Sequence, residues 1–303
     1  MRFAISIPQY AGGHGEFDPS ALRSFLQRAE ELGFEGGWTQ EQVLGSAPVL
    51  APLELLAYAA ACTARLRLGC AVFVTPLHSP VHLAKALATL DCLSGGRVEV
   101  GVGTGGRGRP FAAFGIDADG LVTRFTEGLA LMRACWTEPE INFEGRFWQV
   151  NGALMEPKPI QKPHPPIWIG GNHPAALRRA ARLGDGFIGA GSQPTSAFVD
   201  QARAVREELV RQGRDPASFR VGKRVYIHVD EDAARAHERI EGALAHHYGR
   251  AMPGVSVSGP PASCIAALRE IATAEPDLIL LNPLADDDEQ MERLAAQVIP
   301  ELS

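Results

Sequence analysis

Residues 65–106 have the sequence RLRLGCAVFVTPLHSPVHLAKALATLDCLSGGRVEVGVGTGG, which predicts a strand, a helix, a second strand and a glycine-rich loop in succession. Residues 66–74 are almost wholly apolar without alternation, which is typical of a strand covered on both faces of a parallel sheet. Pro80 marks the start of the helix and Gly95 and Gly96 mark its end. This stretch therefore predicts one strand–helix–strand unit of an α/β fold.

The same unit repeats along the whole chain. Apolar strand candidates lie at 3–7, 34–38, 66–74, 98–102, 167–170, 186–190, 220–229 and 277–281. Helical patterns that begin with Pro or Asp separate them. Eight strands alternating with helices predict an α/β fold of the TIM (β/α)8 barrel type, formed by residues 1–303 as a single domain.

Two intervals are too long for a simple repeat, so we expect insertions after the fourth and seventh strands. Residues 141–166 combine β-rich aromatic residues with a proline-rich segment, which predicts a small hairpin after the fourth strand. Residues 249–262 have the sequence GRAMPGVSVSGPPA, which predicts an irregular segment after the seventh strand. Long loops in compact domains are usually functional, so 249–262 is a candidate lid over the mouth of the barrel.

Composition excludes several classes of partner. The net charge of −6 and the lack of a long basic run argue against nucleic acid. No segment is long and apolar enough to span a bilayer, and the chain begins with a strand pattern rather than a signal peptide. We therefore expect a cytoplasmic protein that binds no membrane. The five cysteines form no Cys-x-x-Cys pair and lie in apolar surroundings, which favours buried thiols over a catalytic or metal role, and no metal site is expected.

The helix predicted at 52–62, PLELLAYAAAC, is apolar on nearly all sides. An outer helix of a monomeric barrel should keep one polar face. The next helix, VHLAKALATLDCL at 81–93, is rich in alanine and would pack closely. These two helices favour a homodimer interface, and the alternative is cover by the chain's own loops.

Two glycine motifs follow predicted strands. GVGTGG at 101–106 matches the dinucleotide pattern G-x-G-x-x-G, but it follows the fourth strand and does not open directly into a helix, so a simple glycine turn is a serious alternative. IWIGGNHPAALRRAA at 167–181 is a strand that ends in glycines before a helix beginning at Pro174. Helix N-termini bind phosphate, so this second motif predicts an anion site at Gly170, Gly171 and Asn172, unless it is a tight turn without a ligand.

Three segments resemble a known family. They are residues 66–105 within the stretch quoted above, RFTEGLALMRACW at 124–136 with FEGRFWQV at 143–150, and PKPIQKPHPPIWIGGNHPAALRRAARLGDGF at 157–187. In this order and spacing they resemble the bacterial-luciferase-like superfamily of flavin-dependent oxidoreductases, also called the luciferase-like monooxygenase family. The resemblance is greatest to members that use the deazaflavin coenzyme F420.

This resemblance implies a function. The expected activity is hydride transfer between coenzyme F420 and a small organic substrate. One alternative is an FMN-dependent monooxygenase that uses reduced flavin and O2, with a separate flavin or deazaflavin reductase as partner. A second alternative is a flavin-binding protein without catalytic activity.

The resemblance also implies which residues surround the cofactor. It implies a cis peptide bond between Ala71 and Val72, behind the isoalloxazine ring. Arg124 is expected to bond the cofactor phosphate, and its alternative is a surface ion pair with Glu127. One wall of the pocket is expected from Gly103, Thr104, Gly105 and Gly106.

Polar residues at the ends of the first two strands complete the predicted site. At the end of the second strand, where relatives carry an acidic residue followed by histidine, this chain has Glu41 and then Gln42. Glu41 is the candidate general acid/base, and Gln40 and Gln42 can hydrogen-bond a substrate or the ring edge. A solvated loop carboxylate is the alternative role for Glu41. His14, after the first strand, is a further candidate for substrate contact.

Overall fold

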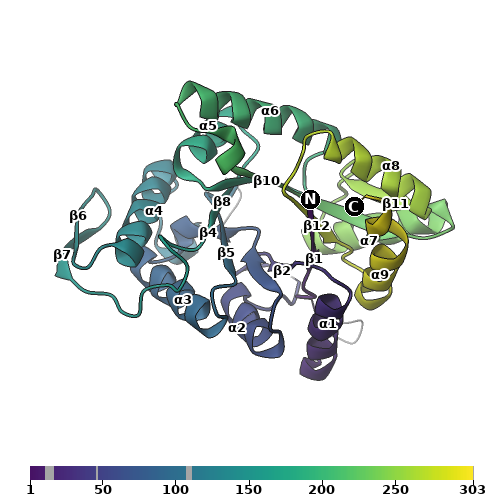
Figure 1. Cartoon of the computed structure of the whole chain (residues 1–303), viewed down its shortest axis with the longest axis horizontal. Coiled ribbons are helices and arrows are strands. Elements are labelled where there is room, and N and C mark those ends of the chain that lie inside the picture. Colours follow the sequence, from purple (N-terminus) through teal and green to yellow (C-terminus); the bar gives the residue numbers. More distant parts are fainter. Residues whose placement is uncertain (11–16, 46, 107–110, 303) are drawn as a thin grey trace.

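The computed structural model describes residues 1–10, 17–45, 47–106 and 111–302, and within them a closed ring of eight parallel strands forms the centre of the molecule (Figure 1). In ring order these strands are β1 (Arg2–Ser6), β2 (Gly36–Thr39), β3 (Arg67–Cys70), β5 (Val98–Gly103), β8 (Ile167–Gly170), β9 (Gly186–Gly189), β10 (Arg220–Val229) and β12 (Leu278–Asn282). The ring closes because β10 pairs with both β9 and β12, and β12 pairs with β1. The predicted α/β TIM barrel is confirmed.

Helices cover the outside of this ring in Figure 1. They are α1 (Pro19–Glu31), α2 (Pro52–Cys62), α3 (Pro80–Leu93), α4 (Leu121–Thr137), α5 (Pro174–Leu183), α6 (Thr195–Arg211), α7 (Ala233–Tyr248), α8 (Pro261–Ala272) and α9 (Asp287–Arg293). Local signals explain several of their ends. Ser79 accepts a hydrogen bond from the backbone N–H of His82 at the start of α3, and Gly95 and Gly96, just past its end, adopt positive φ. None of the helices in the described parts of the chain is long and apolar enough to cross a membrane.

The predicted first strand of the quoted stretch is divided in two. β3 ends at Cys70, and a two-residue strand, β4 (Phe73–Val74), continues the pairing with β5. The Ala71–Val72 peptide bond between them is cis, which confirms that expectation. The predicted hairpin after the fourth barrel strand is also confirmed, because β6 (Ile141–Glu144) and β7 (Gln149–Ala153) pair antiparallel and project from the barrel beside α4 (Figure 1).

The prediction of a wholly irregular segment at 249–262 is wrong. Residues Ser256–Gly259 form strand β11, which pairs in parallel with the second half of β10. β10 is ten residues long, so its part after Tyr226 extends past the barrel and offers a free edge. The sequence SVSG has no apolar run, because only one face of this short strand is buried, and the apolar signal was therefore missing.

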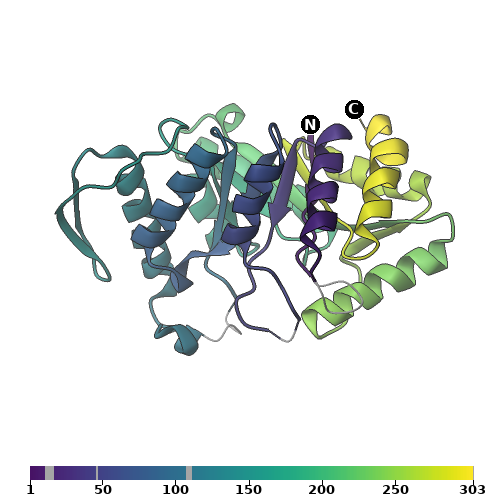
Figure 2. The same ribbon diagram turned by 90° about the horizontal axis from the view of Figure 1, so that it is seen from below.

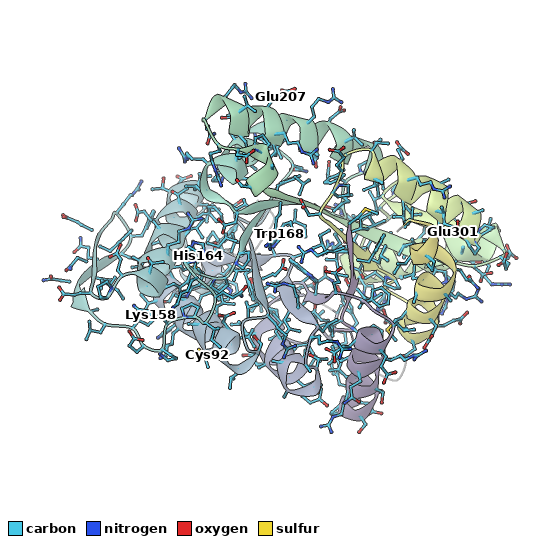
Figure 3. All side chains as sticks on the ribbon, viewed as in Figure 1. Cys92, Lys158, His164, Trp168, Glu207 and Glu301 are labelled. Atoms are coloured by element: carbon cyan, nitrogen blue, oxygen red, sulfur yellow. The ribbon has the colours of Figure 1, made fainter. Side chains whose placement is uncertain are left out.

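The interior of the barrel is filled by two tryptophans and one carboxylate. The rings of Trp38 and Trp168 meet edge to face, 6.1 Å apart, and Trp168 is seen among the strands at the centre of Figure 3. Glycines make room for them, since a Cβ at Gly69 would lie 2.5 Å from the ring of Trp38. Trp168 Nε1 donates to Glu99 Oε2 over 2.7 Å. These side chains therefore fill the interior of the barrel.

Candidate active site

A cavity of about 1030 Å³ opens among the carboxyl ends of the strands. Figure 2 shows the light green α7 running across one end of the barrel. Most residues predicted for the site line this cavity. They are Gln40, Glu41, Gln42, Ala71, Val72, Gly103, Thr104, Gly105, Gly106, Gly170, Gly171 and Asn172. His14 lies outside the described residues.

The Val72 side chain stands between two glycine-containing strands on one wall of the cavity. A Cβ on Gly103 would lie 2.8 Å from Val72 Cγ2, and a Cβ on Gly170 would lie 2.9 Å from Val72 Cγ1. Both distances are shorter than side chains tolerate, so glycine lets β5 and β8 approach the segment after β3. Beyond this point the wall opens, because nothing lies within 4 Å of a Cβ on Gly106. The result is a smooth apolar surface beside open space.

The predicted anion site lies at the amino terminus of α5. His173 caps this helix by accepting a hydrogen bond from Ala175 N over 3.2 Å. Arg179, two turns into the helix, lines the cavity with its guanidinium over the ring of Phe125, at 5.6 Å. Its Nε atom is buried and has no hydrogen-bond partner among the described residues, and burial lowers the pKa of Arg179. The guanidinium of Arg179 and the amino terminus of α5, with its positive dipole end, therefore border the same part of the cavity.

Arg124, the arginine predicted from the resemblance, lies elsewhere. Its Nε donates to the carbonyl of Pro76 over 3.1 Å, and its guanidinium covers the ring of Trp148 at 4.7 Å. It is not among the residues that line the cavity. Glu127, its alternative partner, accepts backbone hydrogen bonds from Arg146 and Phe147. Phosphate binding by Arg124 stays a prediction, and Arg179 is the arginine that sequence analysis missed.

Glu41 is buried, with 5% of its surface exposed, which excludes the alternative of a solvated loop carboxylate. One carboxylate oxygen accepts from Val74 N over 2.6 Å, and the other lies 2.8 Å from Nε2 of His78. Glu41 thus fixes the backbone that follows the Ala71–Val72 bond. Its predicted acid/base role stays a prediction, and His78 is one neighbour within hydrogen-bond distance of its carboxylate.

A polar network that no local motif indicated crosses the cavity floor. Arg224, on the inner face of β10, donates from Nη1 to Gln40 Oε1 over 2.8 Å and from Nη2 to the hydroxyl of Tyr226 over 2.8 Å. Tyr226 in turn shares a short hydrogen bond with the hydroxyl of Tyr248, the last residue of α7. Gln40 also donates to Tyr10 over 2.7 Å. Little in the sequence indicated this network, because Arg224 lies in a strand that also contains Arg220, Lys223 and His228.

Only part of this network faces the cavity. Gln40, Arg224 and Tyr248 line it, whereas Tyr226 is fully buried behind them. Burial raises the pKa of Tyr226 well above its ordinary value. Burial lowers the pKa of Arg224, but the nearby phenols, Tyr226 first, outweigh this and leave it above its ordinary value. A permanent positive charge therefore lies beside the neutral hydroxyl of Tyr226.

Lys223, the neighbour of Arg224, points to the outer face of β10. It is 1% exposed, and its Nζ donates to the carbonyls of Ala190 (2.6 Å) and Gln193 (3.0 Å). Burial, helped by the charge on Arg224, lowers its pKa from 10.5 to about 7. Since Ala190 and Ser192 line the cavity, Lys223 holds the loop that forms this side of the site.

A family model described as luciferase-like monooxygenase matches residues 1–298. The chain belongs to this family. This match confirms the resemblance noted in the sequence. The chain is an enzyme of the luciferase-like family. The carboxyl-end cavity is where TIM barrels form their active sites.

Individual relatives of this luciferase-like enzyme differ in cofactor. The F420-dependent glucose-6-phosphate dehydrogenase of Kineococcus radiotolerans is 30% identical over 240 residues, which are 76% of this chain and 70% of that protein. The FMNH(2)-dependent dimethylsulfone monooxygenase of Pseudomonas putida is 30% identical over 220 residues, 67% of this chain and 60% of that protein. The crystal structure of monooxygenase RslO1 from Streptomyces bottropensis covers 100% of both chains with a TM-score of 0.86 and 26% identity.

Proposed function

We propose that this luciferase-like enzyme transfers a hydride between coenzyme F420 and a small organic substrate. The observation that carries the proposal is the arrangement of the cavity, in which the cis Ala71–Val72 bond and the glycines of β5 and β8 form a smooth wall near an anion site. Similarity to an F420-dependent dehydrogenase over 76% of the chain supports the choice of coenzyme.

The residues present fit a flavin-type cofactor with a phosphate. A flat ring needs a wall without protruding side chains, which Gly103 and Gly170 provide beside Val72. A phosphate needs positive charge. Arg179 on α5 meets this need, because its buried Nε has no partner among the residues that the structure describes. When bound, the cofactor would supply hydride chemistry, and the protein would supply position and charge.

Within this proposal the chain's own residues have distinct roles. Gln40 and Gln42 orient the substrate or the ring edge by hydrogen bonds from the end of β2. Glu41 exchanges a proton with its neighbour His78 over the 2.8 Å contact between Oε1 and Nε2. Thr104, Gly105 and Gly106 close the rim of the pocket.

An FMN-dependent monooxygenase is the second candidate function. The similarity to a dimethylsulfone monooxygenase and the full-length likeness to RslO1 favour it. This function would require a separate reductase to deliver reduced flavin. The same cavity wall and anion site would hold the reduced flavin. A binding protein without turnover is the third candidate.

Titration of the purified protein with coenzyme F420 and with FMN, each followed by fluorescence quenching, tests these proposals. Tight binding of F420 with weak binding of FMN is the expected result. Binding of FMN alone would replace the deazaflavin proposal with the monooxygenase, and binding of neither would refute both. Reduction of bound F420 by candidate alcohols then separates an enzyme from a binding protein.

We also propose a cytoplasmic homodimer that forms through α2 and α3. α2 carries Ala57 and Ala61 on its exposed side, and α3 ends in Leu93, which is 69% exposed. Small and apolar residues at these positions allow two copies to pack closely. Size-exclusion chromatography with light scattering would test the proposal, and a monomer at micromolar concentration would contradict it.

A further inference from the structure

The guanidinium of Arg224 on the cavity floor makes no ion pair with a carboxylate in the described part of the chain. Among the described residues, no Asp or Glu oxygen lies within 4.0 Å of the guanidinium of Arg224, although ion pairs of this length occur throughout the chain. Its electrostatic neighbours are the phenols of Tyr226, Tyr248 and Tyr10 and the thiol of Cys70. Burial raises the pKa of Tyr226, Tyr10 and Cys70, so these three groups are uncharged near pH 7. An unbalanced buried charge is costly, so the floor favours an anion.

Not every N–H group of Arg224 makes a good hydrogen bond. Nη1 bonds Gln40 Oε1 at 2.8 Å and the carbonyl of Ala71 at 3.2 Å, and Nη2 bonds the Tyr226 hydroxyl at 2.8 Å. The fourth contact, from Nη2 to the Tyr248 hydroxyl, is 3.5 Å long, and Nε is buried without a partner in the described structure. A ligand oxygen placed between Nη2 and the Tyr248 hydroxyl would therefore accept a better hydrogen bond from Nη2 than the present 3.5 Å contact.

The direction of the hydroxyl hydrogens supports the same placement. The Tyr226 hydroxyl accepts from Arg224, so its own hydrogen is available for the Tyr248 oxygen. The hydrogen of Tyr248 then has one described acceptor left, Gln40 Oε1 at 3.3 Å, which already accepts from Arg224 over 2.8 Å. Tyr248 lines the cavity. Its hydroxyl is thus a donor for a ligand atom above the floor.

We infer that Gln40, Arg224 and Tyr248 form a carboxylate-binding subsite for the organic substrate, separate from the phosphate site at Arg179. The subsite has one cation and adjacent neutral donors, which suit a planar monoanion. A phosphate dianion would call for a second cation, and no other Lys or Arg is hydrogen-bonded within the described network. This inference rests on the proposed function, because it assigns an organic acid as the substrate of that same cavity.

Calorimetric titration of the purified protein with benzoate, benzamide and inorganic phosphate tests the inference. Benzoate should bind, whereas benzamide, which has the same shape without the charge, should bind at least tenfold more weakly. Phosphate should compete with coenzyme at the α5 end but not with benzoate. No binding of benzoate, equal binding of benzamide, or displacement of benzoate by phosphate would each overturn the carboxylate assignment.

Variants locate the bound benzoate. Arg224→Met should abolish benzoate binding, and Tyr248→Phe should weaken it about tenfold through the loss of one hydrogen bond to a charged group. Arg182→Met, an exposed change of charge on α5, is the matched control and should leave benzoate binding unaltered. If Arg224→Met fails to fold, as judged by circular dichroism, Tyr248→Phe decides. Unchanged benzoate affinity in Tyr248→Phe would refute the subsite.

The same samples separate this inference from the proposed function. Coenzyme binding, followed by F420 fluorescence, should be retained in Tyr248→Phe. Benzoate binding without F420 binding would refute the coenzyme and leave the carboxylate subsite in place. F420 binding without benzoate binding would refute the subsite and leave the proposed hydride chemistry in place.

Discussion

Nη1 of Arg224 lies 2.8 Å from Oε1 of Gln40, which joins the middle of β10 to the end of β2 across 184 residues of sequence. This bond brings the charge of Arg224 next to a residue that the sequence predicted to touch the ligand. Because Gln40 also lies beside the hydroxyls of Tyr10 and Tyr248, a change of its charge would act on the whole network.

Gln40→Glu should stabilise the protein and weaken anion binding. The new carboxylate would have almost the shape of the amide and would balance Arg224, so we expect the free energy of unfolding to rise by about 1–3 kcal/mol. Benzoate affinity should fall at least tenfold, since the anion would then meet a carboxylate. Urea denaturation and calorimetry measure the two effects. Gln42→Glu, on the same wall without an Arg224 contact, is the control, and equal effects in both variants would contradict the argument.

Arg179→Met should weaken the binding of coenzyme F420 about tenfold or more. The change removes the α5 cation whose buried Nε has no partner in the described structure, and a charge-assisted bond to phosphate contributes about 1.5–3 kcal/mol. Fluorescence quenching gives the affinity, and Arg182→Met serves as the matched control on the exposed face of the helix. Arg124→Met tests the arginine predicted from the resemblance, and a larger loss there than in Arg179→Met would assign the phosphate to Arg124.

The sequence predicted the barrel and the outline of the site because these depend on local signals. Apolar runs marked all eight barrel strands, and glycines at strand ends marked most of the cavity wall. β11 was not predicted because it is four residues long and only half buried. Arg179 was not predicted as a site residue because a charged residue on an amphipathic helix is normally solvated. In the structure its guanidinium lies over Phe125.

The polar floor could not be predicted for a different reason. Arg224 and Tyr248 contact Gln40 only because the ring of strands closes and α7 crosses its end. The spacing of these residues in the sequence therefore does not predict the contact. Glu41 illustrates the converse. Its position was predicted, but its bonds to Val74 and His78 depend on the backbone after the cis bond.

Glu99→Gln should destabilise the protein by about 3–5 kcal/mol at neutral pH, because it leaves Arg2 and Arg67 without their buried partner. Burial alone would raise the pKa of Glu99, but these two arginines outweigh it and lower the pKa below its ordinary 4.5. The stabilisation is therefore present above pH 4.5 and is lost as the pH falls through the lower folded-state value. Urea denaturation of both proteins across this range should show the difference shrinking, and a constant difference would contradict the pairing.

Lys223→Met should remove a pH dependence of stability above neutral pH. The pKa of Lys223 is about 7 in the folded protein against 10.5 for an ordinary lysine, so between these values the unfolded chain binds more protons. The free energy of unfolding of the unmodified protein should therefore rise with pH in this window, by at most about 5 kcal/mol relative to Lys223→Met. The carbonyls of Ala190 and Gln193 favour the ammonium and reduce the effect. Denaturation curves at several pH values measure the difference in free energy of unfolding between the two proteins. The contributions of other titrating groups cancel in this difference. A difference independent of pH would show that Lys223 keeps its proton throughout.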